Sequence, residues 1–389
     1  MRFKNILNCF ILLLSLFPAA SRAAAAIETG DMQTRQYMPL LQDKRIAVFS
    51  NPTGMAGDRH IVDLLLENHI NVAAIFAPEH GFRGKADAGE KVENSVDEQT
   101  GVPIISLYGG TKKPLAQLVA PYDILVVDIQ DVGLRFYTYY VTLCKLMDAC
   151  AQSNVEVLIL DRPNPNGFYV DGPVLNMKYK SGVGALPIPV VYGMTLGELA
   201  RMIVGEKWLP SGRDCRLTVI PCKNYTHKSK YVLPVKPSPN LPNMKAVYLY
   251  PSLCYFEATP VSLGRGTDFP FQVYGHPDMK GFPFSFTPRS VEGAKEPPQL
   301  GNKCYGRDLR SIPDKKIWKE GLNLEYFIEA YHAVGIGDKF FRSFMELLIG
   351  QDYVRQMIEQ GKGAKEIKAR WKPDVEKFKE QRKPYLIYK

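Results

Sequence analysis

Short apolar runs recur through the first half of the chain, and each has the length of a buried strand. Stretches with helical spacing separate some of them, over residues 60–67 and 139–152. The apolar runs lie at residues 45–50, 72–76, 103–107, 124–128 and 155–161. Continuous apolar strands that alternate with helices are typical of a parallel sheet covered on both faces. The pattern therefore predicts a Rossmann-like α/β domain.

The second half has a different pattern. Thr195 and Glu198 form a capping box that predicts the start of an amphipathic helix over residues 195–204. Four prolines then fall within residues 233–242, which predicts a stiff, extended segment and a domain boundary. We therefore expect an α/β domain over residues 27–237 and a smaller α+β domain over residues 238–389.

The smaller domain is predicted in less detail. Residues 246–250 look like a strand, and the apolar tail at residues 384–388 is expected to dock on the body of the protein. Helices are predicted over residues 323–334, 339–349 and 364–381.

The N-terminus has the three parts of a secretory signal peptide. Arg2 and Lys4 precede an apolar run over residues 6–18, and the alanine-rich residues 19–26 offer cleavage sites. Residues 1–25 are therefore predicted to be removed, which leaves an exported protein, periplasmic or secreted. No later stretch is long and apolar enough to span a membrane.

The formal charge is +9, and the excess of lysine and arginine gathers near the C-terminus. Export argues against a nucleic-acid partner. A weakly basic surface would suit anionic polymers of the cell envelope, although a solvated helix face is the simpler interpretation.

Six cysteines remain beyond the signal peptide, and an exported protein can pair them. Cys215 and Cys222 flank a short predicted strand and are the best candidates for a disulfide. Cys144 and Cys150 lie in a predicted helix, where they are expected to pack as small apolar side chains.

Titratable side chains cluster in the loop that follows the second predicted strand. Glu79, His80, Arg83 and Glu90 lie there among glycines. Strand ends are where sites collect in α/β folds, and carboxylates with a neighbouring histidine or arginine suit general acid–base chemistry. The alternative is an ordered loop held together by its own salt bridges.

Two further groups of polar residues follow the fourth and fifth predicted strands. Asp128, Asp131 and Arg135 lie in one, and they would suit the hydroxyl groups of a sugar, or else cap a helix and pack. Asp161, Asn164 and Asn166 lie in the other, where prolines hold the loop. This second group presents rigid polar side chains to a ligand, or it is simply a turn. Asp161 should lie near Asp128 in space.

A last group lies in the second half, over residues 255–275. Glu257, Arg265 and Asp268 are surrounded there by aromatic residues. Charges embedded among aromatic rings need partners or a ligand. If they bind one, both halves of the chain build a single cleft.

Missing motifs narrow the chemistry. The sequence has no G-x-S-x-G, H-E-x-x-H, P-loop or G-x-G-x-x-G motif, and its six histidines lack ligand spacing. What remains is a carboxylate enzyme that needs no metal, or a binding protein with a polar cleft. Two-carboxylate chemistry in an exported protein points first to glycoside hydrolysis.

Ordered motifs from about residue 44 to the C-terminus resemble one family, the exo-β-N-acetylmuramidases of the NamZ type. The motifs are SNPTG, FAPEHGFRG, DAGE, DIQDVGLRFYTY, LDRPNPNG, PVVYGMTLGELA, PSPNLP and YPSLCYFE with SLGRGTDFPFQVYG. Ala258 and His276 depart from the usual family pattern, which places substrate preference in question more than reaction class.

The resemblance implies an exo-acting peptidoglycan hexosaminidase with its site in a cleft between two domains. Such an enzyme releases N-acetylmuramic acid from the non-reducing end of β-1,4-linked fragments, with no metal or nucleotide cofactor. We expect Glu90 to be a catalytic carboxylate, with Glu79 or Glu257 as the second. The expected substrate-binding residues are His80, Arg83, Asp128, Asp131, Arg135, Asp161, Asn164, Asn166, Arg265 and Asp268.

One glutamic acid is expected to protonate the glycosidic oxygen while a second carboxylate or the substrate's own N-acetyl group assists. Arg83, Arg135 or Arg265 would grip the lactyl carboxylate of muramic acid. The rival hypotheses are an envelope protein that binds solutes or muropeptides without turnover, and an amidase or esterase, which the missing serine and metal motifs disfavour. The sequence leaves open the stereochemical outcome, the glycan length and the oligomeric state.

Overall fold

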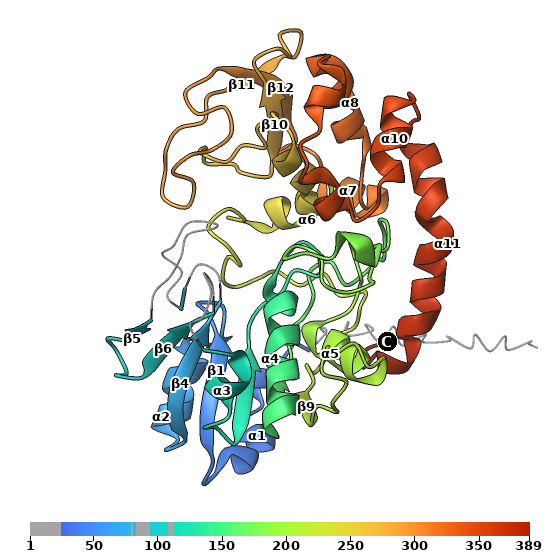
Figure 1. The fold of residues 1–389 in the computed structure, drawn as a ribbon. Coiled ribbons are helices and arrows are strands. Elements are labelled where there is room, and N and C mark those ends of the chain that lie inside the picture. Colours follow the sequence, from blue (N-terminus) through green and yellow to red (C-terminus); the bar gives the residue numbers. More distant parts are fainter. Residues whose placement is uncertain (1–24, 79–80, 83–93, 108–112) are drawn as a thin grey trace, which may run out of the picture.

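A seven-stranded sheet forms the centre of the first of two lobes (Figure 1). The computed structural model describes residues 25–78, 81–82, 94–107 and 113–389. Within them the strand order is β5 (Ser95–Val96), β6 (Pro103–Ser106), β4 (Asn71–Ala77), β1 (Arg45–Ser50), β7 (Ile124–Asp128), β8 (Glu156–Leu160) and β9 (Leu217–Ile220). Every neighbouring pair is parallel except β5 with β6. The predicted α/β class is confirmed, with one antiparallel strand added at an edge.

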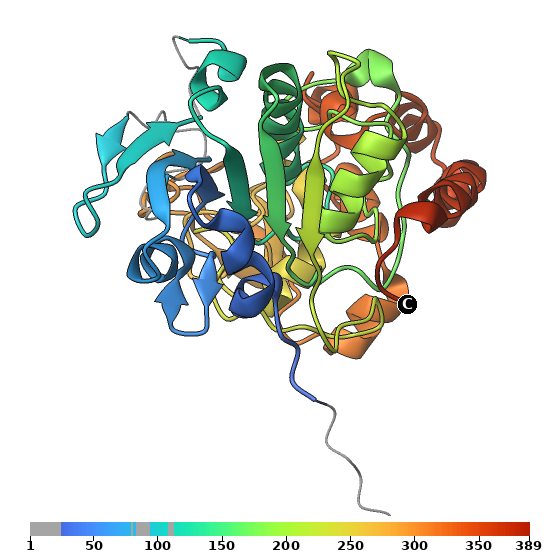
Figure 2. The same ribbon diagram turned by 90° about the horizontal axis from the view of Figure 1, so that it is seen from below.

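Helices cover both faces of this sheet, as Figure 2 shows. One face carries α1 (Thr34–Leu41) and α2 (Ile61–Glu67), and the other carries α3 (Leu115–Val119), α4 (Tyr139–Ser153) and α5 (Leu196–Gly205). Because side chains alternate along a strand, Ile46 and Val48 of β1 enter the core beside α1 and α2. Ala47 and Phe49 enter the core on the opposite face. Burial on both faces explains why these strands are apolar throughout.

The second lobe combines a small antiparallel sheet with helices. Strand β12 (Cys304–Asp308) pairs with both β10 (Val273–His276) and β11 (Phe284–Phe286). The helices are α6 (Met244–Leu253), α7 (Asp314–Glu320), α8 (Glu325–Val334), α9 (Met345–Ile349), α10 (Tyr353–Glu359) and α11 (Ala364–Arg382), with the 3-10 turn η3 (Cys254–Ala258) after α6.

Two predictions for this lobe are wrong in detail. Residues 246–250 are part of helix α6, whose first turn is capped by the Asn243 side chain, which accepts a hydrogen bond from Ala246 N at 3.0 Å. A short apolar run cannot by its pattern be told from a buried helix. The helix predicted over residues 339–349 is split into the 3-10 helix η4 (Gly337–Phe340) and α9, because Arg342 N bonds to Ala258 O instead of to a helical carbonyl.

Helix α11 runs along the side of the molecule and spans both lobes (Figure 1). Near its middle, Trp371 Nε1 donates to Asp171 Oδ1 at 3.0 Å, and at its end Arg382 Nη1 donates to Tyr192 O at 3.3 Å. The chain then returns to the first lobe, where Tyr388 is buried and its hydroxyl donates to Asp161 Oδ2 at 2.6 Å. The apolar tail docks on the body as predicted.

The predicted disulfide between Cys215 and Cys222 is not present, and both thiols are free. The two residues lie at opposite ends of β9, and an extended segment of this length spans roughly 20 Å. A disulfide needs Cα atoms within about 7 Å. Cys222 Sγ instead donates to Asp161 O at 3.1 Å. Cys144 and Cys150 are buried in α4 as predicted.

Candidate active site

Asp128 stands at the end of β7 but faces an internal ion cluster. Arg162 donates to its two oxygens from Nε at 2.6 Å and from Nη2 at 3.0 Å, and the same Nη2 bonds to Asp31 Oδ2 at 2.6 Å. These side chains are at most 3% exposed. Burial and the charge of Asp128 raise the pKa of Asp31 to about 6, although Arg162 opposes the shift. Because the described residues enclose this cluster, Asp128 supports the end of β7, and its predicted contact with substrate stays a prediction.

Asp161 is likewise enclosed at the end of β8. It accepts hydrogen bonds from Thr195 Oγ1 at 2.7 Å, from Gly197 N at 2.9 Å and from the Tyr388 hydroxyl. It is 1% exposed. Its carboxylate therefore joins β8, α5 and the C-terminal tail, and its predicted contact with substrate stays a prediction. Its expected proximity to Asp128 is confirmed, since the next residue, Arg162, bonds to Asp128.

Hydrogen bonds from buried asparagines join the loops at residues 129–138 and 161–167. Asn166 Nδ2 donates to Val132 O at 2.9 Å, and Asn166 N donates to Asn164 Oδ1 at 2.8 Å. Asn164 Nδ2 donates to Met194 O at 2.8 Å. Both asparagines are buried and take part in the packing of the loops, which matches the alternative of a turn, and their predicted contact with substrate stays a prediction.

Asp131 is buried in the first of these two loops. Its Oδ1 accepts from Gly133 N at 2.7 Å and from the Tyr192 hydroxyl at 2.6 Å, while its buried Oδ2 has no hydrogen-bond partner among the residues described. Burial raises the pKa of Asp131 to about 6, even though these hydrogen bonds lower it. Asp131 thus supports the loop rather than facing the cavity described below.

Arg135 is fully buried, and its guanidinium joins the two lobes. Nη1 donates to the carbonyls of Pro173 and Ile188, and Nη2 donates to those of Leu348 and Ile349. Burial lowers the pKa of Arg135. A side chain held by four backbone carbonyls is a structural bridge, and the predicted contact of Arg135 with a substrate carboxylate stays a prediction.

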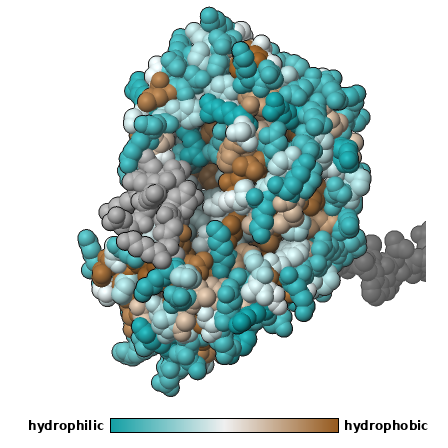
Figure 3. All heavy atoms as spheres, viewed as in Figure 1, coloured by the Kyte–Doolittle hydropathy of each residue, from teal (hydrophilic) through white to brown (hydrophobic). Residues whose placement is uncertain are grey.

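A cavity of about 170 Å³ lies where the lobes meet, and it contains two of the predicted site residues, Glu257 and Arg265. The face drawn in Figure 3 is hollowed near its centre, between the two lobes. The other residues that line the cavity come from the start of α4 and the loop before it, from the loop around residue 183, from the proline-rich segment over residues 233–242 and from the second lobe. They are Phe136, Tyr137, Thr138, Tyr139, Val183, Ser238, Asn240, Leu241, Tyr250 and Phe271.

Glu257 and Arg265 form an ion pair in this cavity. Arg265 donates to Glu257 Oε1 from Nη2 at 2.5 Å and from Nε at 3.1 Å. Among the residues that the structure describes, Oε2 is met only by the weak donor Cys254 Sγ at 3.7 Å. The two side chains remain 25% and 19% exposed. Burial alone would lower the pKa of Arg265, but the charge of Glu257 raises it. One carboxylate oxygen and part of the guanidinium are therefore available to a ligand.

The local backbone explains the position of this pair. Glu257 lies in η3, the 3-10 turn that directly follows α6. Arg265 lies between Gly264 and Gly266, which have φ values of 87° and 80° that side chains other than glycine rarely adopt. A Cβ at Gly266 would also approach Arg289 O to 2.4 Å. The tight loop turns Arg265 back towards Glu257.

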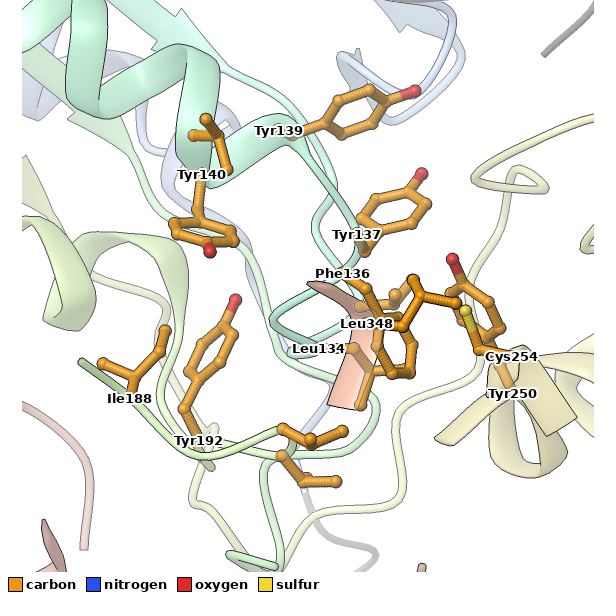
Figure 4. Close-up of a cluster of buried hydrophobic side chains, with 14 of the residues drawn as sticks. Leu134, Phe136, Tyr137, Tyr139, Tyr140, Ile188, Tyr192, Tyr250, Cys254 and Leu348 are labelled. Carbon is orange, nitrogen blue, oxygen red and sulfur yellow. The ribbon is translucent and has the colours of Figure 1, made fainter. Parts of the chain in front are cut away.

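Tyrosines and the linker complete the wall of the cavity. The Tyr137 hydroxyl donates to Pro237 O at 2.6 Å, and Asn240 Nδ2 donates to Gly293 O at 2.8 Å. In Figure 4 the ring of Tyr137 lies beside that of Tyr139, and Tyr250 approaches from the second lobe. The individual assignments from sequence missed Ser238, Asn240 and Tyr250. The motif over residues 237–242 was a signal for the first two.

The remaining predicted residues are placed as follows. Asp268 is exposed and does not line the cavity. Glu79, His80, Arg83 and Glu90 lie outside the described residues. Their loop follows β4, which ends at the same edge of the sheet as β1 and β7 because these strands are parallel.

In the part of the chain that the structure describes, no group of three or more histidine, cysteine, aspartate or glutamate side chains is arranged to hold a metal ion. Over the same residues, no helix combines the length and apolar character needed to cross a membrane.

Comparisons with known proteins agree over almost the whole chain. Residues 46–245 match the N-terminal domain of the exo-β-N-acetylmuramidase NamZ family, and residues 248–388 match its C-terminal domain. The peptidoglycan β-N-acetylmuramidase NamZ of Bacillus subtilis (strain 168) is 37% identical over 385 residues, which cover 93% of this chain and 91% of that protein.

Two crystal structures of DUF1343 family proteins from Bacteroides fragilis NCTC 9343 have the same fold. One is 63% identical with a TM-score of 0.88, and it matches 94% of this chain and 99% of its own. The other is 27% identical with a TM-score of 0.79, and it matches 93% and 99%. Both lobes and their chemistry thus lead to one assignment: the chain belongs to the exo-β-N-acetylmuramidase NamZ family, a family of glycoside hydrolases.

Proposed function

We propose that this protein releases N-acetylmuramic acid from the non-reducing end of β-1,4-linked peptidoglycan fragments, in the cavity between its two lobes. The observation that carries this proposal is the partly exposed ion pair of Glu257 and Arg265 in that cavity. Family membership over both domains supports a hydrolase rather than a protein that binds muropeptides without turnover.

Glu257 is one of two carboxylates in the proposed mechanism. Its Oε2 has no strong hydrogen-bond donor among the described residues, so it can meet the glycosidic oxygen or the anomeric carbon of a sugar. Glycoside hydrolysis usually needs a second acid. We assign this role to Glu90 or Glu79, whose loop begins where β4 ends.

Arg265 is proposed to recognise the lactyl carboxylate that distinguishes muramic acid from glucosamine. Glu257 engages its Nε and one Nη2 hydrogen, and a guanidinium carries five N–H donors. A second carboxylate can therefore share the same planar group. The ring of Phe271, 5.2 Å from the guanidinium carbon, holds the side chain on its other side.

Aromatic residues give the cavity an apolar wall for a sugar ring. Tyr250 and Phe271 pack edge to face with centroids 4.7 Å apart, and Tyr250 also packs against Phe136 at 5.1 Å. Such fixed rings present flat surfaces to the C–H groups of a pyranose, while Glu257 and Arg265 supply polar contacts. We further propose that residues 1–25 direct export of the protein from the cytoplasm to the compartment that contains peptidoglycan.

The test compares a chromogenic β-N-acetylmuraminide with the matching N-acetylglucosaminide. The wild-type protein should release the chromophore from the muraminide only. Arg265→Gln should raise KM for the muraminide by roughly tenfold or more through loss of a charged hydrogen bond. It should also narrow the difference in kcat/KM between the muraminide and the glucosaminide. Arg35→Gln, at an exposed position on α1, makes the same change in charge and is the matched control. Binding of muropeptide without release of the chromophore would instead support the binding-protein alternative.

A further inference from the structure

A second recess lies along α11, where that helix passes Val170 and Asp171 of the first lobe. Its volume is about 400 Å³, and it shares no lining residue with the cavity that holds Glu257. We refer to it as the α11 groove. Lys365, Lys372 and Lys379 line it at intervals of seven residues, which places them about 10 Å apart along the helix.

The charge of the α11 groove is only partly compensated by the protein. Lys368 is committed to Asp171 Oδ2 at 2.8 Å and to Leu322 O at 2.8 Å, and Lys379 pairs with Glu376 at 2.9 Å. Lys365 and Lys372 are exposed and have no ion-pair partner within 4 Å among the described residues. Two ammonium groups two helical turns apart are thus free to meet anionic groups of a ligand.

The floor of the groove is apolar but offers no exposed aromatic face. Trp371 is 1% exposed and spends its indole N–H on Asp171. Val170, Val375 and Ala369 supply small aliphatic surfaces. Sugar rings are commonly held on open aromatic faces, which this lining lacks. Small aliphatic groups between spaced lysines fit a short acidic peptide with small side chains better than a glycan.

We propose that the α11 groove binds the acidic stem peptides of peptidoglycan and so holds the enzyme on the polymer. This inference rests on the proposed function, because it takes its ligand from the same substrate. Stem peptides combine carboxylates with alanine methyl groups, which match the free lysines and the aliphatic floor respectively. Since the groove and the cavity are separate, the peptide bound there belongs to a part of the polymer away from the cleaved sugar.

The test measures co-sedimentation with intact sacculi and with sacculi whose peptides an amidase has removed. Lys365→Glu with Lys372→Glu should weaken binding to intact sacculi roughly tenfold at low salt, and added salt should reduce the difference because exposed charges are screened. The matched control is Lys315→Glu with Lys377→Glu. It makes the same change in charge at exposed positions, on α7 and on the opposite side of α11.

The outcomes separate this inference from the proposed function. Lysine variants that lose sacculus binding but hydrolyse the small chromogenic muraminide at the wild-type rate, with an unchanged Tm, support it. Equal losses in the control pair, or equal wild-type affinity for stripped and intact sacculi, would overturn it in favour of general charge attraction or glycan binding. Failure of the wild type to hydrolyse the muraminide would count against the proposed function, whatever the sedimentation shows.

Discussion

Two groups of acids and arginine in this protein use the same chemistry in opposite surroundings. Arg162 joins Asp128 and Asp31 where the side chains are at most 3% exposed, and its charge is divided between two carboxylates. Arg265 joins Glu257 where the two side chains are 19% and 25% exposed, and one carboxylate oxygen lacks a strong donor within the described part of the chain. The residue types are alike, but only the second group can exchange its partners for a ligand.

The physical difference is the cost of leaving a charge unpaired. A buried charge that loses its partner cannot recover the lost interaction from water, so a closed cluster contributes to stability and resists rearrangement. A partly exposed pair loses less, because water or a ligand replaces the missing contact. Burial therefore distinguishes the two groups of charges. Changes in the cavity should alter activity, and changes in the buried cluster should alter stability.

The largest effect expected on activity is that of Glu257→Gln. Removing one acid–base carboxylate should lower kcat for the chromogenic muraminide by about 10²–10⁴-fold, while Tm stays within a degree or two of wild type, since the site is partly solvated. Steady-state kinetics and calorimetry on the same preparation measure both. A variant that retains more than a third of wild-type kcat would remove Glu257 from the mechanism.

Arg162→Met should have the opposite profile. It leaves Asp128 and Asp31 buried together without their cation, and breaking such a cluster costs about 3–5 kcal/mol. Denaturant unfolding should show this loss, and stabilising conditions should restore kcat to near the wild-type value in the protein that remains folded. Arg59→Met removes an exposed ion pair with Glu67 and is the control, with an expected loss below about 1 kcal/mol. Equal losses in the two variants would contradict the comparison.

The buried carboxylates should also give stability a distinctive dependence on pH. Burial raises the pKa of Asp131 from 3.8 to about 6 in the folded protein. The folded state therefore favours the protonated form, so this contribution is complete below about pH 4 and is lost as the pH rises to about 6. Relative to Asp131→Asn, the wild type should lose about 3 kcal/mol of unfolding free energy across that window. Parallel stability curves for the two proteins would show that the carboxyl titrates normally.

The smallest effect is expected for the N-terminal cap of α5, which also bonds to the buried carboxylate of Asp161. Thr195 accepts from Glu198 N and donates to Asp161 Oδ2, so Thr195→Ala removes both the cap and a bond to a buried carboxylate. The expected loss of stability is about 1–2 kcal/mol, with kcat unchanged. Thr195→Ser keeps both hydrogen bonds and should stay within about 0.5 kcal/mol of wild type. A clear loss of kcat in Thr195→Ala at full folding would place this cap in the reaction.

Much of the first lobe could be predicted from the sequence because its signals are local. Fully apolar strands such as 45–50 and 124–128 follow from burial on both faces, and the capping box at Thr195 and Glu198 is a short-range pattern. The second lobe was harder, because its elements depend on distant contacts. Residues 246–250 are predicted as a strand but lie in helix α6. A hydrogen bond from Arg342 N to Ala258 O interrupts the helix predicted over residues 339–349.

The candidate site shows the same contrast between local signals and distant contacts. The sequence by itself determined the family and the loops that carry polar residues, since these are ordered local motifs. Only the tertiary structure decided which of the described residues are enclosed by the protein and which line the cavity. Arg135 and Arg265 look equivalent in sequence, yet one bonds four backbone carbonyls in the core and the other lines the cavity. The reason is physical, because the partners that satisfy a charge come from segments far away along the chain, and no local pattern records them.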